Sequence, residues 1–338
     1  MERKKRKNLI RLISGLLFLA LLVGFTLCAG HLLPPERTDF GATWNMYLRE
    51  PEDSVDILFF GSSLVYCDVI PAVIYEETGL TSYVMGGPEQ TLSLTYYYIR
   101  EALRTQSPSV IFLELTGVMF ERYQNFTVAN VSYMPLLSEN RIGAALNASE
   151  PEERFGLLFP LYDYHDQWRN LRWFFSGRPD ETPDPLAGYS LMETAEAQTE
   201  RYARDYATAE DVLTENLGWL RKIVALCERE GVRLVLFQVP SCAYVPAAAL
   251  ERARDAAGAG TAVVDFNDCF DTMGIDMETD FYDFLHFNAR GALKFTRALA
   301  AYLAEDGVAP RRAHDEALWQ WRTEVFAAHL AALDSGEV

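Results

Sequence analysis

Two short segments far apart in the 338-residue chain carry residue types suited to nucleophilic chemistry. In the first, the apolar run Ile57–Phe60 is followed by Gly-Ser-Ser at positions 61–63. In the second, Asp283 and His286 supply a carboxylate and an imidazole. A serine hydroxyl becomes an effective nucleophile when a histidine accepts its proton and a carboxylate fixes the histidine tautomer. The sequence therefore predicts a serine nucleophile served by this pair.

The expected nucleophile is Ser63, because it lies where a buried strand ends and a helix begins. The first N–H groups of a helix have no intrahelical partner, and the helix dipole favours negative charge there. Such donors can hold the oxyanion of an acyl-transfer intermediate. Gly-Ser-Ser also occurs in turns and helix caps, so the triplet indicates a nucleophile only in combination with the second segment. Ser62 remains the alternative nucleophile.

Asp283 and His286 lie three residues apart, just before a predicted helix over residues 292–303. At a helix entry this spacing lets a carboxylate and an imidazole converge on one point. His286 can then remove the serine proton during attack and return it to the leaving group. Asp280 is a competing partner for His286, but the spacing favours Asp283.

The elements that must position these residues alternate between strands and helices. Two segments have the length of a helix and apolar residues at helical spacing, Thr91–Gln106 and Asp211–Glu230. Short, almost continuously apolar runs are typical of strands buried on both faces, which predicts an α/β fold with a parallel sheet. The predicted strands are Val55–Phe60, Ser82–Met85, Val110–Leu115, Val232–Val239 and Ala262–Phe266.

This order of motifs resembles the SGNH/GDSL hydrolase family. The similarity covers roughly residues 55–305 and includes Asp-x-x-His-x-Asn-x-x-Gly at 283–291. It implies a three-layer α/β/α sandwich with a parallel, flavodoxin-like sheet, and serine ester hydrolysis or acyl transfer without a cofactor. By the resemblance, Ser63 is the nucleophile, His286 the general base and Asp283 the acid that orients it.

The expected oxyanion site is less complete. The family's second glycine maps to Gly86 or Gly87, and the sequence does not choose between them. The aspartate that usually precedes the nucleophile is Ser62 here, as in members that resemble the membrane-anchored proteins of cell-surface polymer O-acylation. The Gly-x-Asn-Asp block is absent, and residues 114–118 read Glu-Leu-Thr-Gly-Val. Thr116 or a residue of an insertion is expected to replace the missing asparagine.

The N-terminus predicts a membrane segment. A basic tail over residues 1–11 precedes an uncharged run at 12–30, long enough to cross a hydrocarbon core of roughly 30 Å. The basic flank predicts a cytoplasmic N-terminus and an exported body. We expect a single-pass anchor in the cell membrane, with a cleaved signal peptide as the competing interpretation. Residues 31–54 are expected to form a tether.

The charge and the aromatic content of the rest of the chain narrow the possible functions further. Beyond residue 30 it carries 24 basic and 47 acidic residues, so nucleic-acid binding is not expected. Residues 55–309 are predicted to form the catalytic domain, with an aromatic-rich insertion at about 120–209 packed over the catalytic edge of the sheet. Residues 310–338 predict a terminal amphipathic helix, anchored by Leu318, Trp321, Val325 and Leu330.

Together these features predict a membrane-anchored serine esterase or O-acyltransferase acting outside the cytoplasm. Acyl esters, with acetyl the expected group, on a cell-surface polysaccharide or envelope polymer are the expected substrates. The resemblance adds a multispanning membrane acyltransferase as an expected partner, and the apolar run adds the lipid bilayer. The alternative is a non-catalytic scaffold of an O-acylation complex that binds a glycan or a protein partner.

Overall fold

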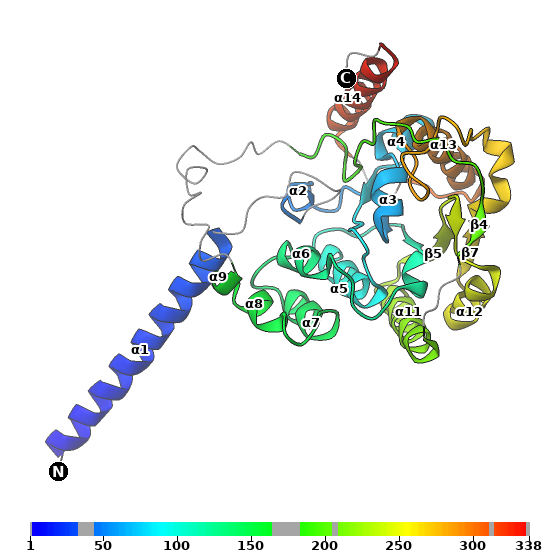
Figure 1. The fold of residues 1–338 in the computed structure, drawn as a ribbon. Helices are drawn as coiled ribbons and strands as arrows, with labels where there is room; N and C mark the ends of the chain where they lie inside the picture. The colour runs from blue at the N-terminus through cyan, green and yellow to red at the C-terminus, as the bar shows by residue number, and fades with distance from the viewer. Residues whose placement is uncertain (1, 33–43, 164–182, 205–208, 311–313, 336–338) are drawn as a thin grey trace.

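The computed structural model describes residues 2–32, 44–163, 183–204, 209–310 and 314–335. Its centre is a five-stranded sheet in the order β2-β1-β3-β5-β7, with every neighbouring pair parallel (Figure 1). All five predicted strands are confirmed, with ends that move by one or two residues. They are β1 Ile57–Phe60, β2 Ser82–Val84, β3 Val110–Glu114, β5 Arg233–Gln238 and β7 Ala262–Asp265.

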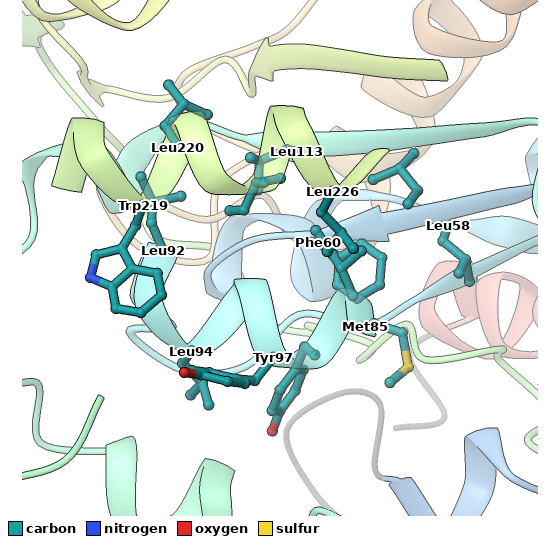
Figure 2. Close-up of a cluster of buried hydrophobic side chains, with 14 of the residues drawn as sticks. Leu58, Phe60, Met85, Leu92, Leu94, Tyr97, Leu113, Trp219, Leu220 and Leu226 are labelled. Atoms are coloured by element: carbon teal, nitrogen blue, oxygen red, sulfur yellow. The ribbon is translucent and has the colours of Figure 1, made fainter. Parts of the chain in front are cut away.

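Helices cover both faces of this sheet because alternate strand residues point to opposite sides. On one face Leu58, Phe60 and Leu113 belong to a buried cluster with side chains of α5 (Leu92–Ala102) and α11 (Glu210–Glu230). Figure 2 shows this cluster, in which Trp219 of α11 lies beside Leu92 of α5. The predicted helices over 91–106 and 211–230 are thereby confirmed.

On the other face Ile57, Phe59 and Phe112 join a second buried cluster. It includes side chains of α3 (Ser63–Asp68), α4 (Pro71–Thr78) and α13 (Ala289–Glu305). Strands buried on both faces explain why their sequences read as uninterrupted apolar runs. The predicted three-layer α/β/α architecture is confirmed.

The remaining described elements are short, apart from the helices near the two termini. A two-stranded parallel ladder joins β4 (Tyr202–Ala203) to β6 (Ala243–Tyr244). The 3₁₀ turns are η1 Thr116–Met119, η3 Phe266–Cys269 and η4 Asp271–Met273. The other helices are α1 Glu2–Leu32, α2 Trp44–Tyr47, α6 Thr127–Ser132, α7 Glu139–Asn147, α8 Arg154–Leu158, α9 Pro160–Asp163, α12 Ala247–Ala257 and α14 Glu316–Ser335.

Helix α1 projects away from the body of the protein (Figure 1). Over Arg3–Thr26 it is apolar and long enough to cross a membrane, and none of that segment is buried inside the protein. One N-terminal apolar helix of this kind fits both a signal anchor and a signal sequence.

Part of the predicted tether belongs to the core instead. Trp44 and Tyr47 of α2 are buried, and the Glu50 carboxylate forms a buried ion pair with the Arg322 guanidinium of α14. The remainder of that stretch, residues 33–43, lies outside the described residues. The expectation of a tether over 31–54 is therefore wrong for residues 44–50, because aromatic side chains there fill space beside the sheet.

The C-terminal helix forms, but it packs on a different face from the predicted one. Trp319, Arg322 and Phe326 are its buried residues, whereas the expected anchors Leu318, Trp321, Val325 and Leu330 are only partly buried. Arg322 faces inward because its guanidinium forms the buried ion pair with Glu50.

The insertion divides into two parts. In the first, α7 packs on α5, and Asn130 of α6 donates from Nδ2 to Pro88 O in the loop that follows β2. In the second, residues 183–204 run beside the loop that carries Asp283 and His286. The backbone N–H of Glu196 donates to Phe281 O at 2.8 Å, and the N–H of Ala289 donates to Met192 O at 2.8 Å. Several of the predicted aromatics, at positions 164, 168 and 173–175, lie outside the described residues.

Candidate active site

The turn that presents Ser63 depends on Gly61. This glycine has φ +154°, and a Cβ there would lie 2.6 Å from both Glu114 Cβ and Val65 Cγ2. A side chain at this position would therefore meet two buried neighbours as well as backbone strain. Beyond it, the Ser62 hydroxyl accepts from Leu64 N–H as the N-cap of α3, and Ser63 becomes the first helical residue.

A tight hairpin presents Asp283 and His286. Phe281 and Phe287 form an antiparallel bridge, and Tyr282 N–H donates to His286 O at 2.9 Å. Asn288 then caps α13 by accepting hydrogen bonds from the N–H groups of Arg290 and Gly291. These contacts explain the spacing of the sequence motif. The hairpin fixes the positions of Asp283 and His286, and Asn288 begins the helix.

The two segments meet at the carboxyl end of the sheet. His286 Nε2 lies 2.7 Å from Ser63 Oγ, although the residues are 223 positions apart. His286 Nδ1 lies 2.9 Å from Asp283 Oδ2 and 3.0 Å from Oδ1. The His286 side chain is 16% exposed, and that of Asp283 is 30% exposed. The three side chains predicted from the sequence form one hydrogen-bonded chain that solvent and a ligand can reach.

The Asp283 carboxylate accepts hydrogen bonds from two backbone N–H groups as well as from the imidazole. Its Oδ1 accepts from Leu285 N–H at 2.7 Å and from His286 N–H at 2.9 Å. Partial burial raises the pKa of this carboxyl, but the hydrogen bonds and charge of His286 and the two backbone donors outweigh it. The net pKa of Asp283 is lowered, which keeps it ionised beside the imidazole.

The competing carboxylate Asp280 has other partners. Its Oδ2 accepts from Lys294 Nζ and from Asp276 N–H, both at 2.6 Å. It is buried behind the hairpin, where its backbone carbonyl also receives Asn288 N–H at 3.0 Å. Asp283 is thus the carboxylate that contacts His286, and Asp280 fixes the base of the loop.

The two candidate glycines differ in their surroundings. Gly87 N–H donates to Gly61 O at 3.2 Å, so it is already occupied. No acceptor for Gly86 N–H is found within the described parts of the chain. A Cβ on Gly86 would lie 2.9 Å from Ser62 O, so its backbone must pass close to the serine turn. This geometry favours Gly86 as the residue beside the nucleophile.

Thr116 is engaged elsewhere than the sequence suggested. Its N–H donates to Glu114 Oε1 at 2.5 Å, and its side chain also bonds this carboxyl. Glu114 Oε2 in turn accepts the Ser62 hydroxyl at 2.9 Å. Burial raises the pKa of Glu114, while the hydrogen bonds from Thr116 and Ser62 lower it; burial dominates. Glu114 therefore connects the serine turn to the strand beside it.

Two further buried residues support the site and were missed from the sequence. Asp68 Oδ1 accepts Phe287 N–H at 2.9 Å beneath the hairpin, and burial raises the pKa of this carboxyl well above its usual range. Asn130 of α6 donates from Nδ2 to Pro88 O at 2.9 Å, which braces the loop containing Gly86. Each is an isolated polar residue in the sequence, so no spacing signal could have found it.

A search of the described residues finds no group of three or more His, Cys, Asp or Glu side chains placed to hold a metal ion.

Comparison with known proteins gives distant structural likenesses. No family model matches the chain, and no curated protein matches it. A solved structure of a candidate platelet activating factor from Streptococcus pneumoniae matches with a TM-score of 0.38 and 14% identity, covering 74% of this chain and 84% of that one. A candidate acylhydrolase from Bacteroides fragilis matches with a TM-score of 0.40 and 12% identity, covering 78% and 99%. The functional argument therefore rests on the geometry of the site.

Proposed function

We propose that the protein is a serine esterase or O-acyltransferase with Ser63, His286 and Asp283 as its triad. The observation that carries this proposal is the unbroken chain from Ser63 Oγ through both His286 nitrogens to Asp283. A structural role alone does not require a partly exposed serine to pair with an imidazole that a carboxylate orients.

The proposed reaction has two halves. Ser63 Oγ attacks the acyl carbonyl carbon while His286 Nε2 takes the hydroxyl proton, and the carbonyl oxygen becomes an oxyanion. The N–H groups of Ser63 and Gly86 hold that oxyanion. As the intermediate collapses, the ester C–O bond breaks and His286 returns the proton to the leaving alkoxide. Water or a sugar hydroxyl, deprotonated by His286, then attacks the acyl-Ser63 carbonyl. The bond between the acyl carbon and Ser63 Oγ breaks, and His286 returns the proton to Ser63 Oγ.

Ser63 is a better candidate nucleophile than Ser62 for a geometric reason. The Ser62 hydroxyl is buried, donates to Glu114 and caps α3. The Ser63 hydroxyl instead contacts His286 and lies at a partly exposed position.

The proposed location and substrate follow from α1 and the sequence. With α1 as an uncleaved anchor, the catalytic domain lies outside the cytoplasm, close to the membrane. A cell-surface polysaccharide or envelope polymer carrying acetyl or other acyl esters suits that location. A multispanning membrane acyltransferase is the proposed partner where the second half-reaction is transfer.

Release of p-nitrophenol from p-nitrophenyl acetate by the full chain in detergent tests the enzyme proposal. We expect Ser63→Ala to lower kcat by at least about a thousandfold, since loss of a triad nucleophile removes most of the catalysis. Equal rates for the wild type and this variant would exclude Ser63 and favour the non-catalytic scaffold. Adding an unacetylated oligosaccharide then separates the two activities, because a transferase gives an acetylated sugar and an esterase gives acetate.

A further inference from the structure

The first part of the insertion exposes an unusual amount of apolar surface. Outside α1, eleven large hydrophobic side chains are exposed among the described residues, and seven of them come from residues 126–162. Phe155 of α8 is 56% exposed, Phe159 between α8 and α9 is 48% exposed, and Tyr162 of α9 is 65% exposed. Ile142 and Leu146, one turn apart on α7, are 47% and 45% exposed. We call Phe155, Phe159 and Tyr162 the apolar patch.

The patch is built on a well-packed base. The Phe155 ring centroid lies 5.0 Å from that of Phe159 and 5.3 Å from that of Tyr162, so the three aromatics form one cluster. Beneath them the buried Arg141 guanidinium donates to Ser132 O, Met134 O and Leu157 O, which ties α6, α7 and α8 together. A rigid unit therefore holds these side chains outward, and the exposure is a feature of the fold.

Its position relative to α1 identifies what covers it. Helix α9 contacts α1, and Figure 1 shows that contact at the end of α1 remote from the N-terminus. With 31 residues, α1 is about 46 Å long, close to a bilayer of roughly 40–45 Å that includes both headgroup layers. When its basic end lies at the cytoplasmic face, its other end reaches the outer headgroups. Phe155, Phe159 and Tyr162 then lie at the depth where aromatic side chains are enriched in membrane proteins.

The charges nearby distinguish the kind of membrane contact. Residues 126–162 contain two basic and four acidic residues, so anionic headgroups gain no attraction from this segment. Burial of the apolar patch must supply the binding.

We propose that the apolar patch rests in the outer leaflet of a zwitterionic bilayer and seats the catalytic domain beside α1. The inference rests on α1 remaining attached, as in the proposed function, but it does not depend on the chemistry of Ser63. A second contact with the bilayer would fix the orientation of the domain relative to the membrane.

Photo-crosslinking in phosphatidylcholine nanodiscs tests this proposal with the full chain. The lipid carries a diazirine on its acyl chain close to the glycerol, and mass spectrometry maps the adducts. We expect adducts on α1 and on the peptide with Phe155, Phe159 and Tyr162, about tenfold above the peptide with Tyr282 and Phe284. Those two residues are exposed aromatics of the hairpin and serve as the internal control. Yields at α8 and α9 should stay the same at high salt, because no charge attraction is involved.

A variant with Phe155→Ser, Phe159→Ser and Tyr162→Ser should lose adducts at α8 and α9 while α1 keeps them. Labelling of residues 155–162 no higher than that of the control peptide overturns the proposal. If α1 is labelled in that case, the anchor holds and only the seating is wrong. Cross-links between the patches of two copies without lipid adducts would assign the surface to self-association and also overturn it.

Discussion

The Glu114 carboxyl lies directly behind the serine turn, where its Oε2 accepts the Ser62 hydroxyl at 2.9 Å. The same side chain accepts Thr116 N–H through Oε1, and it is buried. In the family that the sequence resembles, a Gly-x-Asn-Asp block follows this strand. Here a buried glutamate instead fixes the residue that precedes the proposed nucleophile, so we assign Glu114 a positioning role.

Replacing Glu114 tests that role. Glu114→Ala leaves the buried donors of Ser62 and Thr116 without an acceptor, at about 1–3 kcal/mol for each unsatisfied group. We expect kcat for p-nitrophenyl acetate to fall by roughly ten- to a hundredfold as the Ser63 turn shifts. Glu114→Gln keeps a carbonyl for Thr116 and can donate to Ser62 Oγ, so it should retain more activity than the alanine variant. Equal kcat in all three proteins would remove Glu114 from the positioning of Ser63.

Asp283→Asn tests how the imidazole is oriented. The asparagine carbonyl can still accept the N–H groups of Leu285 and His286, so the hairpin should keep its shape. Its amide would present a donor to His286 Nδ1 and favour the wrong tautomer. We expect kcat to fall by roughly 10³–10⁴ with little change in KM, as in other triads. Glu278→Gln, an exposed carboxylate on the same loop, is the matched control, and a comparable loss in it would contradict a specific role for Asp283.

Asp68 makes stability depend on pH. Because burial raises the pKa of Asp68, the folded protein holds a proton that the unfolded chain has lost above about pH 4. The folded state then binds more protons, so stability falls as pH rises through the window between the unfolded and folded pKa values, by up to about 1.4 kcal/mol per pH unit.

Asp68→Asn removes this titration and keeps an acceptor for Phe287 N–H. Urea unfolding between about pH 4.5 and pH 7 should show a flatter stability profile for the variant than for the wild type. Glu114, which also has a raised pKa, contributes equally to both proteins. Superimposable profiles would mean that Asp68 is ionised in the folded state.

The buried pair of Glu50 and Arg322 joins the N-terminal and C-terminal ends of the described body. Both side chains are almost fully buried, and Arg322 Nε also donates to Asp184 O at 2.9 Å. Glu50→Ala leaves a buried guanidinium without its counter-charge, and we expect a loss of about 3–5 kcal/mol in the free energy of unfolding.

The double variant Glu50→Leu, Arg322→Met removes both charges and should recover much of that loss. The exposed pair of Glu210 and Arg252 provides the control, since Glu210→Gln should change the urea midpoint little. A double variant less stable than Glu50→Ala would contradict this interpretation of the pair.

Much of the sheet could be predicted because its strands are buried on both sides. Runs such as Val110–Leu115 contain few polar residues, so their apolar pattern is unambiguous. Along the chain they alternate with segments of helical spacing, as in an α/β fold. Ser63 and His286 could be paired from the sequence because the motif around each reflects local geometry. A strand must break at Gly61, and Asn288 must cap the helix after the hairpin.

Residues whose partners are distant in sequence could not be predicted. The burial of Arg322 has no signal in the sequence, since only the fold shows that Glu50 lies opposite it, 272 positions away. The burial of Trp44 and Tyr47 of α2, where a tether was expected, likewise depends on distant parts of the chain. Thr116 was expected at the oxyanion site, but its hydrogen bonds to Glu114 depend on how the chain turns after β3. Gly86 and Gly87 are separated only by contacts that the fold creates, namely the bond from Gly87 N–H to Gly61 O and the close approach of Gly86 to Ser62 O.

Reaction of the full chain with a fluorophosphonate probe, followed by mass spectrometry of its peptides, tests the central claim most directly. A serine activated by His286 should form a phosphonyl adduct on Ser63, and Ser63→Ala and His286→Ala should abolish that adduct while both proteins stay folded. An adduct on Ser62 would contradict the assignment of the nucleophile. Complete absence of a serine adduct in the folded wild type would contradict the acyl-transfer account itself.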